Sequence, residues 1–423
     1  MDSAIISRKV VVTGIGVVSP NGFGREDFWK ALLAGRSGVG RISHFDPDEL
    51  GLDVKIAAEV RDFNIADFFP DKRKTGGMLK DMDRVTLFAM AAAKMALEDA
   101  RFEVRSGVQE RVGTFIGTGV GGLHTTINDQ LRLVAEGPRR IGVRSVIRMM
   151  GNAPAGQVAI EFGAKGRAKS ETTACASGLD SLLDAYLYIK NDRADVMIAG
   201  GTEACIEPIA LASFGNMMAL SRRNDDPMKA SRPFCADRDG FVMGEGAVIL
   251  ILEELKHAMR RNAPVIAEIV GGGATCDASH IVAPDEYGDG AVRALREALL
   301  DAKVSPSDIG YINAHGTSTP LNDERETLAI KRVFGKLAYK LPISSTKSMV
   351  GHLLGAAGPI GAAATALSLL NQKVHPTINY EKPDPKCDLD YVPNYPRSLN
   401  LRYAAVQALG FGGHNTALVM ARA

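Results

Sequence analysis

Ala96-Leu97-Glu98-Asp99-Ala100 ends the helical pattern Thr86–Ala100, which leads into a strand-like run at Arg111–Gly119. A closely similar segment, Ala298-Leu299-Leu300-Asp301-Ala302, ends a later helical pattern and leads into a second strand-like run at Ile309–Gly316. A further strand-like run precedes each helix. These runs are Lys9–Val18 and Pro264–Val270. The repeated order predicts two copies of one α/β unit.

The border between the copies falls in a basic, helical stretch at about residues 255–263. We therefore expect an N-terminal half at residues 1–259 and a C-terminal half at 260–423. No Gly/Ser-rich linker separates them, so the halves should pack as one body. A chain of 423 residues is long enough to bury a large core.

Composition excludes several classes of protein. The net charge is +1, which gives no bulk attraction for nucleic acid, so any acidic partner needs a local basic patch. The five cysteines show no CxxC pair, which argues against a zinc site and a disulfide framework. Met1–Lys9 lacks the apolar core of a signal peptide, and no stretch reaches the length of a membrane span. We expect a cytoplasmic protein without bound metal.

One cysteine lies where a nucleophile is expected. Cys175, in Ser170-Glu171-Thr172-Thr173-Ala174-Cys175-Ala176-Ser177-Gly178, precedes a helix with an apolar stripe at positions 179, 182, 183 and 186. The free N–H groups and the dipole at a helix start favour a thiolate, and small neighbours let a substrate carbonyl approach. A buried core cysteine is the alternative.

Two histidines lie in similar glycine-rich and hydroxyl-rich surroundings. His315 lies in Asn313-Ala314-His315-Gly316-Thr317-Ser318-Thr319, and His352 lies in Lys347-Ser348-Met349-Val350-Gly351-His352. Each follows a short strand-like run, and such composition brings backbone close to a ligand. A lone histidine of this kind is more often structural, but two together with Cys175 indicate a site.

With these three blocks the chain resembles the β-ketoacyl-ACP synthases of the thiolase superfamily. The likeness extends from Val10-Val11-Val12-Thr13-Gly14 to Gly410-Phe411-Gly412-Gly413-His414-Asn415, and includes Asp239-Gly240-Phe241-Val242-Met243-Gly244-Glu245-Gly246. It is similar to the type II elongating class and to the ketosynthase α subunits of type II polyketide systems. The resemblance implies a five-layer α-β-α-β-α fold with one mixed sheet from each half.

The resemblance also implies a reaction. An acyl chain would move from acyl-ACP to Cys175, and malonyl-ACP would then condense with it by decarboxylation, in fatty acid or polyketide synthesis. No cofactor is expected beyond the phosphopantetheine of the carrier. The N–H groups of Cys175 and Phe411 would hold the oxyanion, and neutral His315 and His352 would donate to the enolate.

Further residues take roles through the resemblance. Lys347 and Glu326 would form a buried pair that supports the histidines, although a Lys and a Glu on solvated faces would look the same. Thr317 and Thr319 would bond a pantetheine arm, or be plain turn residues. Phe411 would be a mobile gate, flanked by Gly410 and Gly412, facing a loop at Gly271–His280.

Some positions depart from the family pattern. Leu409 stands where another Phe is usual and His414 where Thr is usual, which affects the shape of the gate and the accepted chain length. Gly117–Gly122 matches GxGxxG, but Asp129 and Glu136 lie too close for a dinucleotide fold. The resemblance instead sets Val120 at the wall of the acyl pocket.

An acidic carrier protein needs basic residues at its docking surface. The candidates are Arg139, Arg140, Arg223, Lys72, Arg73 and Lys74. Charged runs are otherwise ordinary solvated surface, and Lys80-Asp81 stands where the family often has a basic pair. We also expect a dimer in which strands near Cys175 and at Asp195–Ala199 pair across a two-fold axis.

Three alternatives differ in function. A ketosynthase α subunit would be active only as a heterodimer with a homologous chain-length factor. A non-catalytic chain-length partner would usually lack the nucleophile. A thiolase would use a late second cysteine, and the only one, Cys387, lies in an Asp-rich segment.

Overall fold

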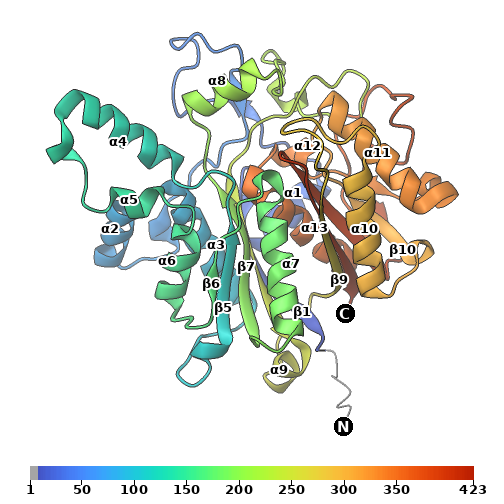
Figure 1. The fold of residues 1–423 in the computed structure, drawn as a ribbon, viewed down its shortest axis with the longest axis horizontal. Helices are drawn as coiled ribbons and strands as arrows, with labels where there is room; N and C mark the ends of the chain where they lie inside the picture. The colour runs from blue at the N-terminus through green and yellow to red at the C-terminus, as the bar shows by residue number, and fades with distance from the viewer. Residues whose placement is uncertain (1–7) are drawn as a thin grey trace.

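The computed structural model describes residues 8–423 (Figure 1). The expectation about a signal peptide at Met1–Lys9 therefore lies almost wholly outside the described residues. Of the described helical segments, one, Leu354–Asn371, is apolar and long enough to cross a membrane, but 89% of it is buried inside the protein. It is the kind of segment that forms the core of a folded domain.

A central sheet passes through the whole molecule, and each half of the chain supplies five of its main strands. The first half contributes, in spatial order, β6 (Ala168–Lys169), β5 (Val112–Gly117), β7 (Val196–Glu203), β8 (Gly246–Glu254) and β1 (Val10–Ser19). The second half continues with β9 (Ala267–Cys276), β15 (His414–Arg422), β14 (Tyr403–Gly410), β10 (Ile309–Asn313) and β11 (Ile343–Ser344). A short strand, β2 (Gly22–Phe23), pairs with β1.

The strand order is the same in both halves. Counted along the chain, each half has its first strand beside its fifth, then its fourth, second and third. This confirms the thiolase-like fold from duplicated halves. The sequence led us to expect a separate sheet in each half, but the two five-stranded parts form one continuous sheet. They join because Val10–Val12 of β1 pairs with Ala267–Ile269 of β9.

Helices occupy a central layer and two outer layers. The two central helices, α7 (Ser177–Lys190) and α13 (Ala357–Asn371), pack against each other and against strands of both halves. The outer helices α3 (Arg84–Asp99) and α10 (Asp289–Ala302) cover the first strands of the two halves. Figure 1 shows α7 between the two parts of the sheet. The central layer is where both halves can contribute to one site.

The repeated pentapeptide has the same packing role in each half. A Cβ added to Gly14 of β1 would lie 2.2 Å from the Ala96 carbonyl oxygen, and one added to Gly271 of β9 would lie 2.5 Å from that of Ala298. Only glycine lets the helix approach the strand so closely. The close contact therefore needs both the glycine of the strand and the alanines of the helix.

The aspartate of each pentapeptide also has a matching role. Asp99 accepts a hydrogen bond from the Ile15 N–H at 2.9 Å, and Asp301 accepts one from the Gly272 N–H at 3.2 Å. These bonds satisfy backbone groups beside the close helix contact. The glycines of β9 are thus strand residues, and the expected loop at Gly271–His280 begins only at Asp277.

The remaining elements surround this framework. The helices are α1 (Gly24–Leu33), α2 (Lys72–Asp81), α4 (Leu123–Glu136), α5 (Ser145–Met149), α6 (Ala153–Phe162), α8 (Pro208–Asn216), α9 (Leu255–Arg260), α11 (Pro320–Phe334) and α12 (Lys347–Val350). The short strands are β3 (Gly40–Arg41), β4 (Ile56–Ala57), β12 (Lys373–Val374) and β13 (Arg397–Ser398).

The expected dimer pairing through Asp195–Ala199 is wrong. β7 is paired on one side with β5 and on the other with β8, so its backbone groups are already used within the chain. The edge strand on this side of the sheet is β6.

Candidate active site

Cys175 lies at the amino end of the central helix α7, as the sequence predicted. It belongs to the short 3₁₀ turn Ala174–Ala176 that continues into α7, and only 6% of it is exposed. Ala174 has φ +51°, a left-handed conformation that costs a non-glycine residue about 1 kcal/mol. A strained residue directly before the sulfur indicates a position fixed by its surroundings.

His352 contacts the sulfur directly. Its Nε2 lies 3.1 Å from Cys175 Sγ, and its Nδ1 accepts a hydrogen bond from the Leu354 N–H at 3.1 Å. In a neutral imidazole the nitrogen that accepts carries no proton, so the proton lies on Nε2. Nε2–H therefore points toward the sulfur and toward any substrate beside it.

His315 completes a triangle with these two residues. Its ring centroid lies 5.3 Å from that of His352, and the planes are nearly perpendicular. Lys347 Nζ lies 3.4 Å from His315 Nδ1 and also donates to the His315 carbonyl oxygen at 2.5 Å. With Nδ1 facing an ammonium donor, His315 also carries its proton on Nε2.

Glu326 supports His315 through the backbone. Its carboxylate accepts the N–H groups of His315 and Gly316 at 2.6 and 2.7 Å, and Gln407 donates to it as well. Within residues 8–423 the structure contains no direct ion pair between Glu326 and Lys347, but both side chains are buried and both bond His315, as expected of a buried pair that supports the site. The two side chains bond different parts of His315: Glu326 accepts from its N–H group, and Lys347 donates to its carbonyl oxygen.

Burial dominates the protonation states. It lowers the pKa of both histidines well below the ordinary value, so they are neutral, and it lowers the pKa of Lys347 to about 8. Burial also raises the pKa of the Cys175 thiol to about 11, although Lys347 and the N–H groups of Phe411 and Cys175 oppose it. The expectation of a low-pKa thiolate is therefore wrong.

The backbone N–H groups of Phe411 and Cys175 lie close enough to the Cys175 sulfur to lower the pKa of its thiol. The approach is close because Gly410, the last residue of β14, has no side chain: an added Cβ would lie 3.3 Å from the Cys175 nitrogen. Cys175 and Phe411 thus present two backbone donors from different halves of the chain to one point. This is the arrangement that an oxyanion requires.

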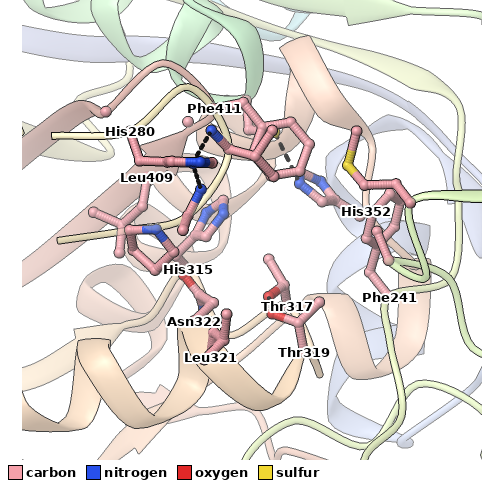
Figure 2. A pocket seen from close by; sticks show the side chains of 18 of the residues that line it. Phe241, His280, His315, Thr317, Thr319, Leu321, Asn322, His352, Leu409 and Phe411 are labelled. Carbon is pink, nitrogen blue, oxygen red and sulfur yellow. Dashed lines mark hydrogen bonds between the residues drawn. The ribbon is translucent and has the colours of Figure 1, made fainter. Parts of the chain in front are cut away.

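A cavity of about 390 Å³ leads to the sulfur. Thr317 and Thr319 line it, and their hydroxyl groups bond each other at 2.9 Å. Figure 2 shows both threonines facing the space below the histidines and Phe411. Asp277 and His280 of the loop expected to face the gate line the cavity, and lining residues for which the sequence analysis assigned no role include Phe241, Leu321 and Asn322. Their positions depend on tertiary packing, so no local pattern indicated them.

The predicted pocket residues divide into two groups. Leu409 and Gly410 line the cavity, and Leu409 also packs against Ala291 and Val292 of α10. Val120 does not line it: the glycine turn after β5 directs this side chain outward, and 48% of it is exposed. In the single chain, the expectation of Val120 at the pocket wall is therefore wrong.

Gly412 and His414 surround the gate residue. Gly412 has φ +83° and is absent from the cavity lining, but the His414 ring packs over it, 3.1 Å from where a Cβ would lie. The Gly412 N–H donates to Ile281 O at 2.8 Å, so the segment following Asp277 does face the gate.

The six basic candidates lie outside the cavity lining. Lys72, Arg73 and Lys74 form the first turn of α2, where Lys74 pairs with Glu161. Arg139 and Arg140 form a short turn after α4, and Arg223 pairs with Asp226. Asp81, the acidic departure, is paired with Arg144.

Two family models match the chain. The β-ketoacyl synthase N-terminal domain matches residues 7–258, and the β-ketoacyl synthase C-terminal domain matches residues 266–381. The chain belongs to the β-ketoacyl synthase family.

Among curated proteins it is 47% identical over 411 residues to a 3-oxoacyl-[acyl-carrier-protein] synthase 2 of Synechocystis sp., covering 97% of each chain. It is 45% identical to the protein of the same name from Staphylococcus aureus, covering 98% of each.

Solved structures agree with this membership. A ketosynthase of a type II polyketide synthase, in complex with its acyl-carrier protein, superposes with a TM-score of 0.91 at 37% identity, covering 99% of this chain and 100% of the other. A β-ketoacyl synthase from Burkholderia phymatum superposes with a TM-score of 0.89 at 36% identity, covering 98% and 100%.

Proposed function

We propose that this β-ketoacyl synthase elongates an acyl chain held on a carrier protein by condensing it with a malonyl unit. The observation that carries the proposal is the contact between Cys175 Sγ and His352 Nε2, with His315 beside them and the backbone N–H groups of Phe411 and Cys175 near the sulfur. Close relatives named 3-oxoacyl-[acyl-carrier-protein] synthase 2 support the same reaction.

In the first half-reaction Cys175 takes the acyl group. The thiol gives up its proton, the sulfur attacks the thioester carbonyl, and the carrier thiol leaves with a proton. The N–H groups of Cys175 and Phe411 stabilise the negative oxygen of the tetrahedral intermediate. His352 Nε2–H, 3.1 Å from the sulfur, stabilises the thiolate before the attack.

In the second half-reaction a malonyl thioester enters. Its bond to the carboxylate breaks and CO2 leaves, so that electrons move onto the thioester oxygen as an enolate. Neutral His315 and His352, each with a proton on Nε2, donate to that oxygen. The enolate carbon then attacks the acyl group on Cys175, and the sulfur leaves as a thiolate that is protonated again.

The proposed substrates arrive on a carrier protein. A type II polyketide ketosynthase of the same fold has been solved with its acyl-carrier protein, which supports this partner. The cavity threonines Thr317 and Thr319 would bond the amide groups of the pantetheine arm. The proposed reaction needs no cofactor beyond that arm, and a reducing cytoplasm would keep Cys175 free.

A second candidate is a polyketide ketosynthase subunit that works with a chain-length factor. A solved ketosynthase/chain-length-factor structure matches 99% of this chain with a TM-score of 0.90 at 35% identity. The curated synthases are closer, at 45–47% identity. The products of the isolated chain separate the two candidates. One condensation per cycle by the chain alone supports the elongating synthase. Products that form only after a homologous partner is added support the subunit.

The first test is acylation of Cys175. Wild-type protein mixed with acyl-carrier should gain the mass of the acyl group, and further addition of malonyl-carrier should give a 3-oxoacyl-carrier two carbons longer. Cys175→Ala should gain no acyl mass. If this variant is acylated as the wild type is, Cys175 is not the nucleophile.

The histidines are tested in the same assay. His315→Ala and His352→Ala should each lower CO2 release from malonyl-carrier by roughly 10²–10³, the usual cost of losing one preorganised donor. His315→Ala should keep the acylation step, because His315 does not contact the sulfur. Undiminished CO2 release by either variant would remove that histidine from the site.

A further inference from the structure

The two oxyanion donors lie on segments that are more than 200 residues apart, so something must hold them in register. Cys175 belongs to the turn before α7, and Phe411 belongs to the hairpin between β14 and β15. Where Gly410 passes the cysteine turn, no side chain of its own links the two segments. An oxyanion tolerates only a small error in donor position.

Asp180 links these segments, although the proposed chemistry does not use it. It lies one turn into α7, and its two carboxylate oxygens accept from different elements. Thr173, two residues before Cys175, donates to Oδ2, and Thr416, on β15, donates to Oδ1. Asp180 therefore connects the nucleophile turn of the first half to the hairpin strand of the second half.

The Thr173 end of this link holds a strained turn. Ala174, the next residue, has φ +51°, and such backbone persists only where neighbours fix it. Ser177 supplies one restraint, because its Oγ accepts the Thr173 N–H at 2.9 Å and donates to the Ala174 carbonyl at 2.6 Å. The Thr173 hydroxyl bond to Asp180 supplies the other.

The Thr416 end holds the gate hairpin. Thr416 pairs with Ala408, and the ladder closes at Gly410 and His414, directly beside Phe411. A shift of β15 along α7 would therefore move the Phe411 N–H relative to the Cys175 N–H. Thr416 is 1% exposed, so its hydroxyl depends on Asp180 as a protein partner.

We propose that Asp180 is a positioning residue that fixes the distance between the Cys175 and Phe411 backbone donors by bridging Thr173 and Thr416. This role rests on the proposed function. Asp180 does not touch the substrate, so its loss should weaken stabilisation of the transition state and leave carrier binding unchanged.

The test compares acyl transfer in three variants. Asp180→Ala and Thr416→Val should lower the maximal rate of Cys175 acylation about tenfold or more, with the KM for acyl-carrier unchanged. Asp180→Asn should stay within about threefold of wild type, because its amide accepts from one threonine and donates to the other. The double variant D180A/T416V should lose no more than D180A alone, since both break one bridge.

Thr365→Val is the matched control, since Thr365 is a buried threonine of α13 whose hydroxyl bonds only within its helix. It should keep the wild-type rate.

All variants are compared at matched thermal stability. If D180A fails to fold, T416V and D180N still test the proposal. The proposal is overturned if T416V acylates at the wild-type rate, if D180N is as slow as D180A, or if the losses multiply. Absence of acylation in the wild type would instead refute the proposed function, and this role with it.

Discussion

Cys175 must lose its proton before it can attack a thioester, yet its buried surroundings favour the thiol. Burial raises its pKa to about 11, and the groups that oppose burial are the Lys347 charge and two backbone N–H groups. His352 Nε2–H adds a third donor at 3.1 Å. Reactivity therefore depends on how many donors face the sulfur, more than on the helix start.

The pH dependence of Cys175 alkylation should show this. A thiol with its pKa raised gains thiolate only at high pH, so the rate with iodoacetamide should keep rising past pH 9 without a plateau. Lys347 is charged below its own pKa of about 8, where it supports the thiolate. Lys347→Met should therefore slow alkylation below pH 8 and match wild type above pH 9.

Lys331→Met is the control for this experiment, because Lys331, on α11, pairs with Asp388 and is absent from the cavity lining. Its alkylation profile should equal that of the wild type. A plateau of the wild-type rate below pH 8 would show a low-pKa thiolate and would contradict the interpretation. Mass spectrometry locates the label on Cys175 and separates it from the exposed Cys276.

At the scale of elements, the tip of the β14–β15 hairpin carries a side chain suited to move, the Phe411 ring, while its backbone is bonded to the segment that contains Asp277 and Ile281. Its tip has Gly412 and Gly413 at φ +83° and +80°, and the Phe411 ring lines the cavity, 6.3 Å from the Phe214 ring of α8. A bulky ring on a glycine backbone can swing at low cost, which suits a gate that opens once Cys175 is acylated.

Phe411→Ala should uncouple the two half-reactions. Without the ring, malonyl-carrier should reach the histidines before Cys175 is acylated, so CO2 release without condensation should rise several-fold. The backbone N–H remains in place, so acylation itself should continue. Phe214→Ala is the control that alters the ring's neighbour only. Unchanged coupling and an unchanged preference for acyl chain length would leave Phe411 as packing alone.

Local patterns predicted the elements and the three residues that meet at the cavity. The helix start at Cys175, the glycine-flanked histidines and the repeated pentapeptide are each visible within about ten residues of sequence. Long-range pairing was not visible. Four features depend on segments that lie far apart in the chain. They are the separate bonds of Lys347 and Glu326, the central place of β7, the exposure of Val120 and the desolvation of the thiol.

At the scale of the whole molecule, the net charge of +1 leaves carrier binding to local patches. Charge reversal at Arg139, Arg140 and Arg223 should raise the KM for acyl-carrier and leave the KM for acyl-pantetheine unchanged. Arg105→Glu, at an exposed arginine between α3 and β5, is the control and should change neither. Equal losses with both substrates would indicate misfolding and would refute docking at these residues.

The surface of the single chain also predicts its assembly. Apolar side chains on and beside α4 and α5 are unusually exposed, with Val134 at 78%, Val143 at 96% and Val146 at 61%. Figure 1 shows α4 projecting from the body on the side where the sheet ends in β6. An unpaired edge strand beside an exposed apolar surface favours a second copy. Light scattering at micromolar concentration should therefore give twice the mass of the chain.

Val134→Glu and Val146→Glu should shift the protein to monomer, because each would bury a charge in the contact. Leu300→Glu is the matched control, since Leu300 is equally exposed, at 79%, but lies on α10. It should leave the mass unchanged. A wild-type monomer would contradict a homodimer, and recovery of the doubled mass on adding a homologous ketosynthase chain would show a heterodimer through the same surface.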